Sequence, residues 1–168
     1  GKVHENDIDE SNNLYKTIAL GALKYFILKV DARKRMLFNP EESIDFNGNT
    51  GPFIQYTYAR INSILNKNKL ELNMSSDISI NKKEKDLIKN ILEFPKVIQE
   101  AAKSFNPSLI ANYIFELVKE YNSYYQSTSI LKAEADSLVI FRVLLSKRIS
   151  TNIKSGMSLL GIDVPERM

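Results

Sequence analysis

Hydrophobic positions repeat every three or four residues along most of the chain, the spacing that places them on one face of an α-helix. Strand-like alternation is almost absent. The predicted helices cover residues 14–30, about 51–69, 81–95, 96–105, 107–125 and about 133–160. The chain is therefore predicted to be all-α, an antiparallel bundle of about five helices preceded by one further helix and a connector.

Several helix ends have recognisable signals. Thr50 is a suitable cap before a helix with proline in its first turn, and Asn81 with Glu84 resembles a capping box. Gly161 is a natural stop after the last helix. Pro95 lacks the N–H that a helix interior requires, so we expect it to kink or break its helix, with a separate segment after it.

The first predicted helix and the segment after it differ in pattern. Residues 14–30 are apolar on most sides, so this helix should be buried between other elements. Residues 31–49 break the helical pattern, Pro40 should push Asn39 out of the helical conformation, and Asn47 and Gly48 signal a turn. We interpret residues 31–49 as a connector with room for one brief strand.

Composition describes a folded domain of ordinary size. The chain has 168 residues, of which 43% are hydrophobic and 26% charged, and it has no cysteine. The absence of thiols fits a cytoplasmic protein. No apolar stretch reaches the roughly 20 residues needed to cross a bilayer, and the acidic residues 1–13 do not resemble a signal peptide.

The positive charge is unevenly distributed. Residues 1–13 hold one lysine against four acidic residues, a local charge of −3. Because the net charge of the chain is +3, the remaining residues carry +6. Residues 33–35 are all basic, and Arg142, Lys147, Arg148 and Lys154 lie in a stretch free of acids. Such clusters can bind phosphates, although solvation of helix faces explains them equally well.

Residue sets for catalysis or metal binding are missing from the sequence. The single histidine, His4, lies in an acidic lead-in that we expect to be flexible and solvated, so neither a His-based triad nor a zinc site is predicted. The Gly-rich signatures of phosphate-binding loops do not occur. Residues 48–51 can touch a phosphate as a turn before a helix, but a plain turn and cap is the simpler interpretation. We therefore predict no catalytic residue.

The helix predicted from about residue 51 has two distinct faces. Its core stripe consists of Ile54, Tyr58, Ile61 and Leu65. Phe53, Tyr56 and Arg60 fall on a second stripe, well over 100° away around the helix. Aromatic rings and guanidinium groups are the side chains that grip unpaired bases, although packing of the two rings against a neighbouring helix is the alternative.

A second aromatic group closes the helix of residues 107–125. Tyr121 continues the core stripe of that helix, whereas Tyr124 and Tyr125 lie at its end, where we expect a ring to be able to protrude.

Two motifs resemble one known family. The stretches L-G-A-L-K-Y (residues 20–25) and F-N-G-N-T-G-P-F-I-Q-Y-T-Y-A-R-I (residues 46–61) are similar to arginyl-tRNA synthetases, which carry F-x-G-N-T-[GA]-P-[YF]-x-Q-Y-x-x-x-R at the entry to their anticodon-binding domain. The chain also finishes in E-R-M, as that family does. The resemblance covers nearly the whole chain from about residue 14 onward.

The resemblance implies a helical domain that reads the anticodon loop of arginine tRNA. The positions that match the family's anticodon-binding residues are Phe53, Tyr56, Arg60, Tyr124, Tyr125 and Met168. Phe53 stands where the family often has tyrosine, which keeps stacking but removes a hydroxyl. Gly48, Asn49, Thr50 and Gly51 match a loop near the tRNA that shifts when tRNA binds. With the family in view, base contact becomes the preferred interpretation of the aromatic stripe.

The same resemblance implies what the chain does not do. The H-I-G-H-like and K-M-S-K-S-like signatures of the ATP site are missing, so this fragment should bind and not catalyse. Residues 1–45 would be the tail of the catalytic domain, and residues 46–168 the anticodon-binding domain. The parent enzyme would use ATP and Mg²⁺, with its catalytic domain as a partner in cis. The alternative is a freestanding helical module for protein–protein interaction.

Overall fold

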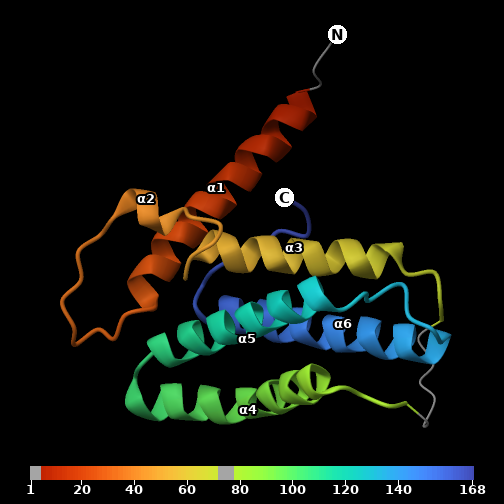
Figure 1. Cartoon of the computed structure of the whole chain (residues 1–168). Helices are drawn as coiled ribbons and strands as arrows, with labels where there is room; N and C mark the ends of the chain where they lie inside the picture. Colours follow the sequence, from red (N-terminus) through yellow and green to blue (C-terminus); the bar gives the residue numbers. More distant parts are fainter. Residues whose placement is uncertain (1–4, 72–77) are drawn as a thin grey trace.

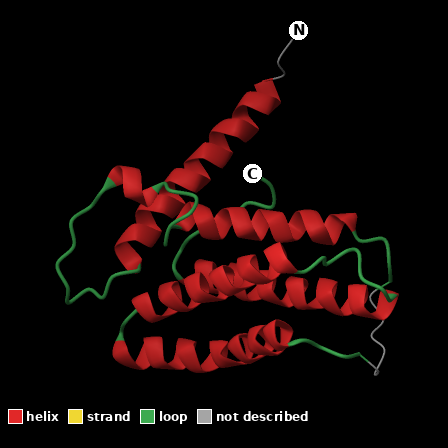
Figure 2. Ribbon diagram, in the orientation of Figure 1, coloured by secondary structure: helices red, strands yellow, loops and turns green. Residues whose placement is uncertain are grey.

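The computed structural model describes residues 5–71 and 78–168, with side chains from residue 10 onward. This part of the chain contains six helices and no strand, which confirms the all-α prediction (Figure 2). They are α1 (Glu5–Leu28), α2 (Pro40–Ser43), α3 (Gly51–Lys67), α4 (Lys82–Ser104), α5 (Ser108–Ser127) and α6 (Asp136–Leu159). None of these helices is long and apolar enough to span a membrane. His4 lies outside the described residues, and so does most of the polar stretch of residues 74–80, which the sequence predicts to be a linker between helices.

The last four helices form an antiparallel bundle. Each of α4, α5 and α6 runs opposite to the helix before it, with α3 at one side and α4 at the other of the pair α5 and α6 (Figure 1). Helix α1 crosses the beginning of α3 obliquely, contacts α5, and projects beyond the bundle (Figure 1). One continuous core joins the bundle to the second half of α1, where Tyr25 is fully buried.

The core follows the predicted stripes. In α3, Ile54 and Ile61 are fully buried and Tyr58 nearly so, while Leu65 packs at the edge of the core. The same core includes six fully buried side chains of the central helices α5 and α6: Ile114, Leu117, Tyr121, Ile149, Ile153 and Met157. Burial of each such side chain contributes roughly 1.5–3 kcal/mol, so the packed stripes supply most of the bundle's stability.

Most helix ends were predicted correctly. Thr50 caps α3, its side-chain oxygen accepting from the N–H of Phe53, and Asn81 with Glu84 forms the complete capping box of α4. Gly161 adopts φ +68° directly after α6, as expected of a helix stop. Helix α1, however, begins at Glu5, nine residues before the predicted start, because an acidic segment without apolar periodicity still suits the first turns of a helix.

The connector contains a one-turn helix instead of a strand. Asn39 is extended, as expected before proline, and its side chain accepts from the N–H groups of Glu41 and Glu42. Pro40 occupies the first position of α2, where its missing N–H costs nothing.

Pro95 does not break its helix, one of the two outcomes predicted for it. Helix α4 runs through Pro95 without interruption, so the bundle has four long helices where five segments were expected. Pro95 has no N–H to donate to the carbonyl of Ile91, four residues earlier. The buried side chain of Asn152 supplies a donor, with its Nδ2 at 3.4 Å from that carbonyl oxygen. A partner from α6 therefore compensates locally for the proline.

Candidate nucleic-acid interface

The beginning of α3 is fixed by a close crossing with α1. A Cβ added to Gly51 would lie 2.5 Å from the carbonyl oxygen of Gly21, so the two backbones touch where the helices cross. Gln55, fully buried one turn later, donates its amide to the carbonyls of Thr17 at 3.2 Å and Asp163 at 2.8 Å. The glycines and the glutamine of the two sequence motifs thus join α1, α3 and the C-terminal segment.

The turn of residues 48–51 is held against α1. The hydroxyl of Tyr25 donates to Oδ1 of Asn49 at 2.7 Å, and Nζ of Lys29 donates to the carbonyl of Asn49 at 3.0 Å. Thr50 uses its side chain as the cap of α3. The segment forms the plain turn and cap, and its shift on tRNA binding stays a prediction.

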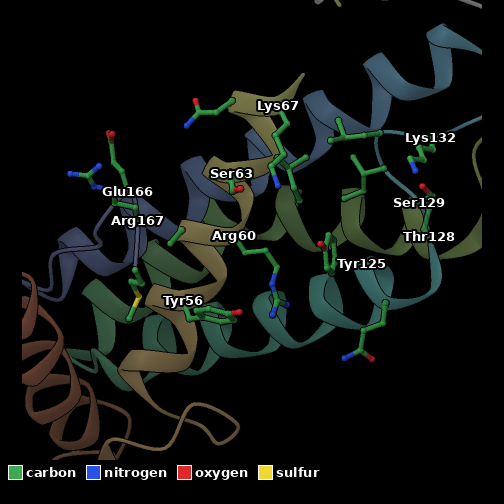
Figure 3. Close-up of a pocket in the computed structure, with 17 residues that line it drawn as sticks. Tyr56, Arg60, Ser63, Lys67, Tyr125, Thr128, Ser129, Lys132, Glu166 and Arg167 are labelled. Atoms are coloured by element: carbon green, nitrogen blue, oxygen red, sulfur yellow. The ribbon is translucent and has the colours of Figure 1, made fainter. Parts of the chain in front are cut away.

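Arg60 lies between two tyrosine rings at the surface. Its guanidinium carbon is 4.8 Å from the ring centroid of Tyr56, one turn earlier in α3, and 5.1 Å from that of Tyr125 in α5 (Figure 3). Both distances are within the range of cation–π attraction. Tyr56 is 41% exposed and Tyr125 38% exposed, so both rings have surface available to a ligand.

A buried amide holds Arg60 from beneath. Nη1 of Arg60 donates to Oδ1 of Asn122. The Nδ2 of Asn122 donates in turn to the hydroxyl of Thr57 at 2.8 Å and the carbonyl of Val118 at 2.9 Å. The guanidinium is therefore oriented before any ligand arrives, and its other N–H groups are left for recognition.

This cluster faces a cavity of about 1000 Å³, which we call the Arg60 pocket (Figure 3). Its lining includes Tyr56, Arg60, Tyr125 and Met168, and the basic side chains Lys67, Lys132 and Arg167. Of the described residues in this lining, only Glu166 is acidic. The pocket therefore combines aromatic surface with an excess of positive charge, which suits a base attached to a phosphate chain.

A second cavity of about 1010 Å³ lies against α1, and we call it the α1 hollow. Tyr56, Arg60, Gln126 and Met168 line both cavities. Phe53 lines only the α1 hollow, half-buried, with its ring centroid 6.0 Å from that of Phe115. The structure thus brings Tyr56, Arg60, Tyr125 and Met168 together and places Phe53 on the neighbouring side.

Tyr124 does not join this surface. It is fully buried, and its hydroxyl donates to Oε1 of Glu84 at 3.1 Å. Burial, followed by the negative charge of Glu84, raises the pKa of Tyr124. The expectation that its ring protrudes was wrong, because Tyr124 continues the buried stripe of Leu117 and Tyr121 at helical spacing.

The basic stretch of α6 divides into two kinds of residue. Arg142 forms an ion pair with Glu84 at 2.9 Å and is largely buried, so it is not available to a phosphate. Lys147, Arg148 and Lys154 are exposed, as expected of either phosphate contacts or a solvated helix face.

Lys67, Lys132 and Arg167 were not singled out from the sequence as site residues. They come from the end of α3, the segment between α5 and α6, and the C-terminus, and only the fold brings them to one cavity. No local sequence pattern connects them.

The helical bundle, with an oriented arginine between exposed tyrosines, has the character of a module that binds unpaired bases. The sequence model of the DALR anticodon binding domain matches residues 54–168, and the chain belongs to that family. Anticodon binding is thus the role of this domain.

Relatives of the whole chain point to one kind of enzyme. The chain is 58% identical over 168 residues to the arginine–tRNA ligase of Flavobacterium psychrophilum, covering 100% of this chain and 28% of the relative. It is 51% identical over 173 residues to that of Parabacteroides distasonis, covering 100% of this chain and 29% of the relative. The chain thus spans less than a third of the relatives' length. These matches confirm the resemblance inferred from the sequence motifs.

Solved structures of arginyl-tRNA synthetases also contain a region with the fold of this chain. The arginyl-tRNA synthetase of Thermus thermophilus superposes with a TM-score of 0.85 at 31% identity, over 90% of this chain and 27% of that one. The synthetase of Plasmodium falciparum gives 0.81 at 27% identity, over 93% of this chain and 28% of that one.

Proposed function

We propose that this chain is the anticodon-recognising part of an arginine–tRNA ligase, and that the Arg60 pocket holds an unpaired base from the anticodon loop of arginine tRNA. The observation that carries this proposal is the position of Arg60 between Tyr56 and Tyr125, fixed by Asn122. An oriented guanidinium offers hydrogen bonds to a base edge or a phosphate, and the two rings offer stacking surfaces.

The other residues of the Arg60 pocket have distinct roles in this proposal. Met168 contributes an apolar side chain to the lining of the pocket. Lys67 and Lys132 neutralise phosphates at the mouth of the pocket. Tyr124 is left out because it is part of the core.

The parent protein would attach arginine to its tRNA with ATP and Mg²⁺ in the cytoplasm. We assign these reactants to the part of the protein that this chain lacks, since no residue set for that chemistry occurs here. In the same proposal, residues 1–45 are the end of the catalytic domain, its partner in cis, and residues 46–168 form the anticodon-binding domain.

The test is binding of the chain to a transcript of arginine tRNA and to the same tRNA with its central anticodon base changed, each at two salt concentrations. We expect preference for the native anticodon and an affinity that falls as salt rises. Tyr56→Ala should remove the preference without unfolding, because Tyr56 is 41% exposed. Leu92→Ala, which removes an exposed side chain from α4, is the matched control.

Two results would contradict the proposal. One is equal binding of both tRNAs by the parent chain together with an unchanged affinity of the Tyr56 variant. The other is binding that does not weaken with salt, which would favour an apolar contact with another protein instead.

A further inference from the structure

The α1 hollow is lined by aromatic rings, two of which are largely exposed and do not belong to the hydrophobic core. Tyr15 of α1 is 68% exposed and Phe46 of the connector is 46% exposed, yet both line this cavity together with Phe53 and Tyr56. The centroids of the Phe46 and Tyr56 rings are 6.2 Å apart, with the rings perpendicular. Exposed aromatic rings gathered at one concave site are typical of binding surfaces.

The charge at this hollow suits nucleic acid. Among the residues that the structure describes, its lining includes Arg60 and Lys119 but no aspartate or glutamate. Lys119 forms an ion pair with Glu116 at 3.1 Å, and its Nζ lies 5.9 Å from the Phe115 ring centroid. The floor is apolar, with Leu14 and Ile18 from α1. Such a lining favours a flat, weakly polar group attached to an anion.

The α1 hollow adjoins the Arg60 pocket. Tyr56, Arg60, Gln126 and Met168 border both cavities, so Tyr56 and Arg60 form a wall between two adjoining compartments. Neighbouring bases of an unpaired strand are joined through a single phosphate, and proteins commonly spread them onto separate aromatic surfaces. A strand with one base in the Arg60 pocket therefore has the next base within reach of the α1 hollow.

We propose that the α1 hollow is a second nucleobase site, which takes the base adjacent to the one in the Arg60 pocket and stacks it on Tyr15 and Phe46. This inference rests on the proposed function and adds a contact from α1, outside the residues 54–168 that the family model matches. Because the rings offer flat surfaces and few hydrogen-bonding groups, the site holds either purines or pyrimidines.

The experiment uses the complete chain and a hairpin with the anticodon stem and loop of arginine tRNA, labelled for fluorescence anisotropy. A series of hairpins carries one abasic nucleotide at each loop position in turn. With the parent chain, loss of a base at two adjacent positions should weaken binding, each by roughly 5- to 150-fold, the worth of one stacked base. Tyr15→Ala should weaken binding of the intact hairpin to the same extent and remove the sensitivity at one of those positions only.

Matched variants separate stacking from other effects. Tyr15→Phe keeps the ring and should bind as the parent does, while Tyr125→Ala should remove the sensitivity at the other position. Leu37→Ala, at a side chain that is 90% exposed, is the control for loss of exposed apolar surface. Melting curves should be unchanged for the Tyr15 variants, because its ring is mostly in solvent.

The outcomes distinguish the two proposals. If Tyr125→Ala weakens binding and Tyr15→Ala leaves every hairpin affinity unchanged, the second site is wrong and the proposed function stands. If Tyr15→Ala weakens all hairpins by one common factor, including every abasic one, stacking of a particular base is excluded. If no single abasic position weakens binding to the parent, the proposed function itself fails.

Discussion

Arg142 donates its Nε–H to Oε1 of Glu84 across 2.9 Å, and this ion pair joins the beginning of α4 to α6 inside the bundle. Glu84 is fully buried, and the Arg142 side chain is 13% exposed. The same carboxylate accepts from the N–H of Asn81 at 2.7 Å and from the hydroxyl of Tyr124 at 3.1 Å. One glutamate therefore caps its own helix and anchors two others.

Removal of the arginine should destabilise the fold strongly. Arg142→Met leaves the buried carboxylate of Glu84 without its counter-charge, and such a loss costs about 3–5 kcal/mol. Urea unfolding followed by circular dichroism measures this difference in the free energy of unfolding. Lys147→Met, five residues later and exposed, is the control and should change it by less than about 0.5 kcal/mol. Equal stability of the two variants would mean that solvent replaces the arginine.

The contacts of Glu84 also show which features of the fold can be predicted from the sequence and which cannot. Its capping role follows from Asn81 three residues earlier, a local relationship. Its pairing with Arg142 spans 58 positions and depends on how α4 and α6 pack, so the sequence analysis considered only a phosphate contact or a solvated helix face for Arg142. Caps and stripes are set by neighbours along the chain, whereas the partners of buried charges are set by tertiary contacts.

The residues of the candidate site also divide into those placed by local sequence and those placed by tertiary contacts. Tyr56 and Arg60 were predicted to share a face of one helix, since they are four residues apart. The spacing of Tyr124 from Leu117 and Tyr121 places it on the buried stripe, whereas Tyr125 points about 100° away, so helical periodicity separates the two residues although the sequence analysis treated them together. The place of Lys132 at the pocket depends on the path of the segment between α5 and α6, which has no regular pattern.

The crossing of α1 and α3 predicts a contrast between two glycines. Gly51→Ala would place its Cβ 2.5 Å from the carbonyl oxygen of Gly21, a backbone atom that cannot move aside, and should cost about 1–3 kcal/mol. Gly48→Ala places its Cβ no closer than 3.5 Å to Asp45 or Thr50 and should change stability by less than about 1 kcal/mol. Thermal unfolding of both variants checks this, and a smaller cost at Gly51 than at Gly48 would contradict the crossing geometry.

The compensation at Pro95 predicts coupling between two distant residues. Asn152→Ala alone removes the side-chain donor near the Ile91 carbonyl and should cost about 1–3 kcal/mol. In a Pro95→Ala background the restored backbone N–H can serve that carbonyl, so the same substitution should cost at least about 0.5 kcal/mol less. A double-mutant cycle measured by guanidinium unfolding gives the coupling directly. Strict additivity would show that Asn152 stabilises the bundle only through its other contact, the hydroxyl of Tyr113.

The two lysines at the Arg60 pocket should contribute affinity without anticodon preference. Lys67 and Lys132 are exposed, and neither has an ion-pair partner among the residues that the structure describes, so both are available to phosphates. Each lysine→Met change should weaken binding of native and altered anticodons by the same factor and make the slope of log affinity against log salt shallower by about 0.7, the value for one phosphate contact on a single strand. Lys89→Met on α4 is the control and should leave the slope unchanged. A slope that stays constant in both pocket variants would place the phosphates elsewhere, and an altered anticodon preference would mean that a lysine contacts a base.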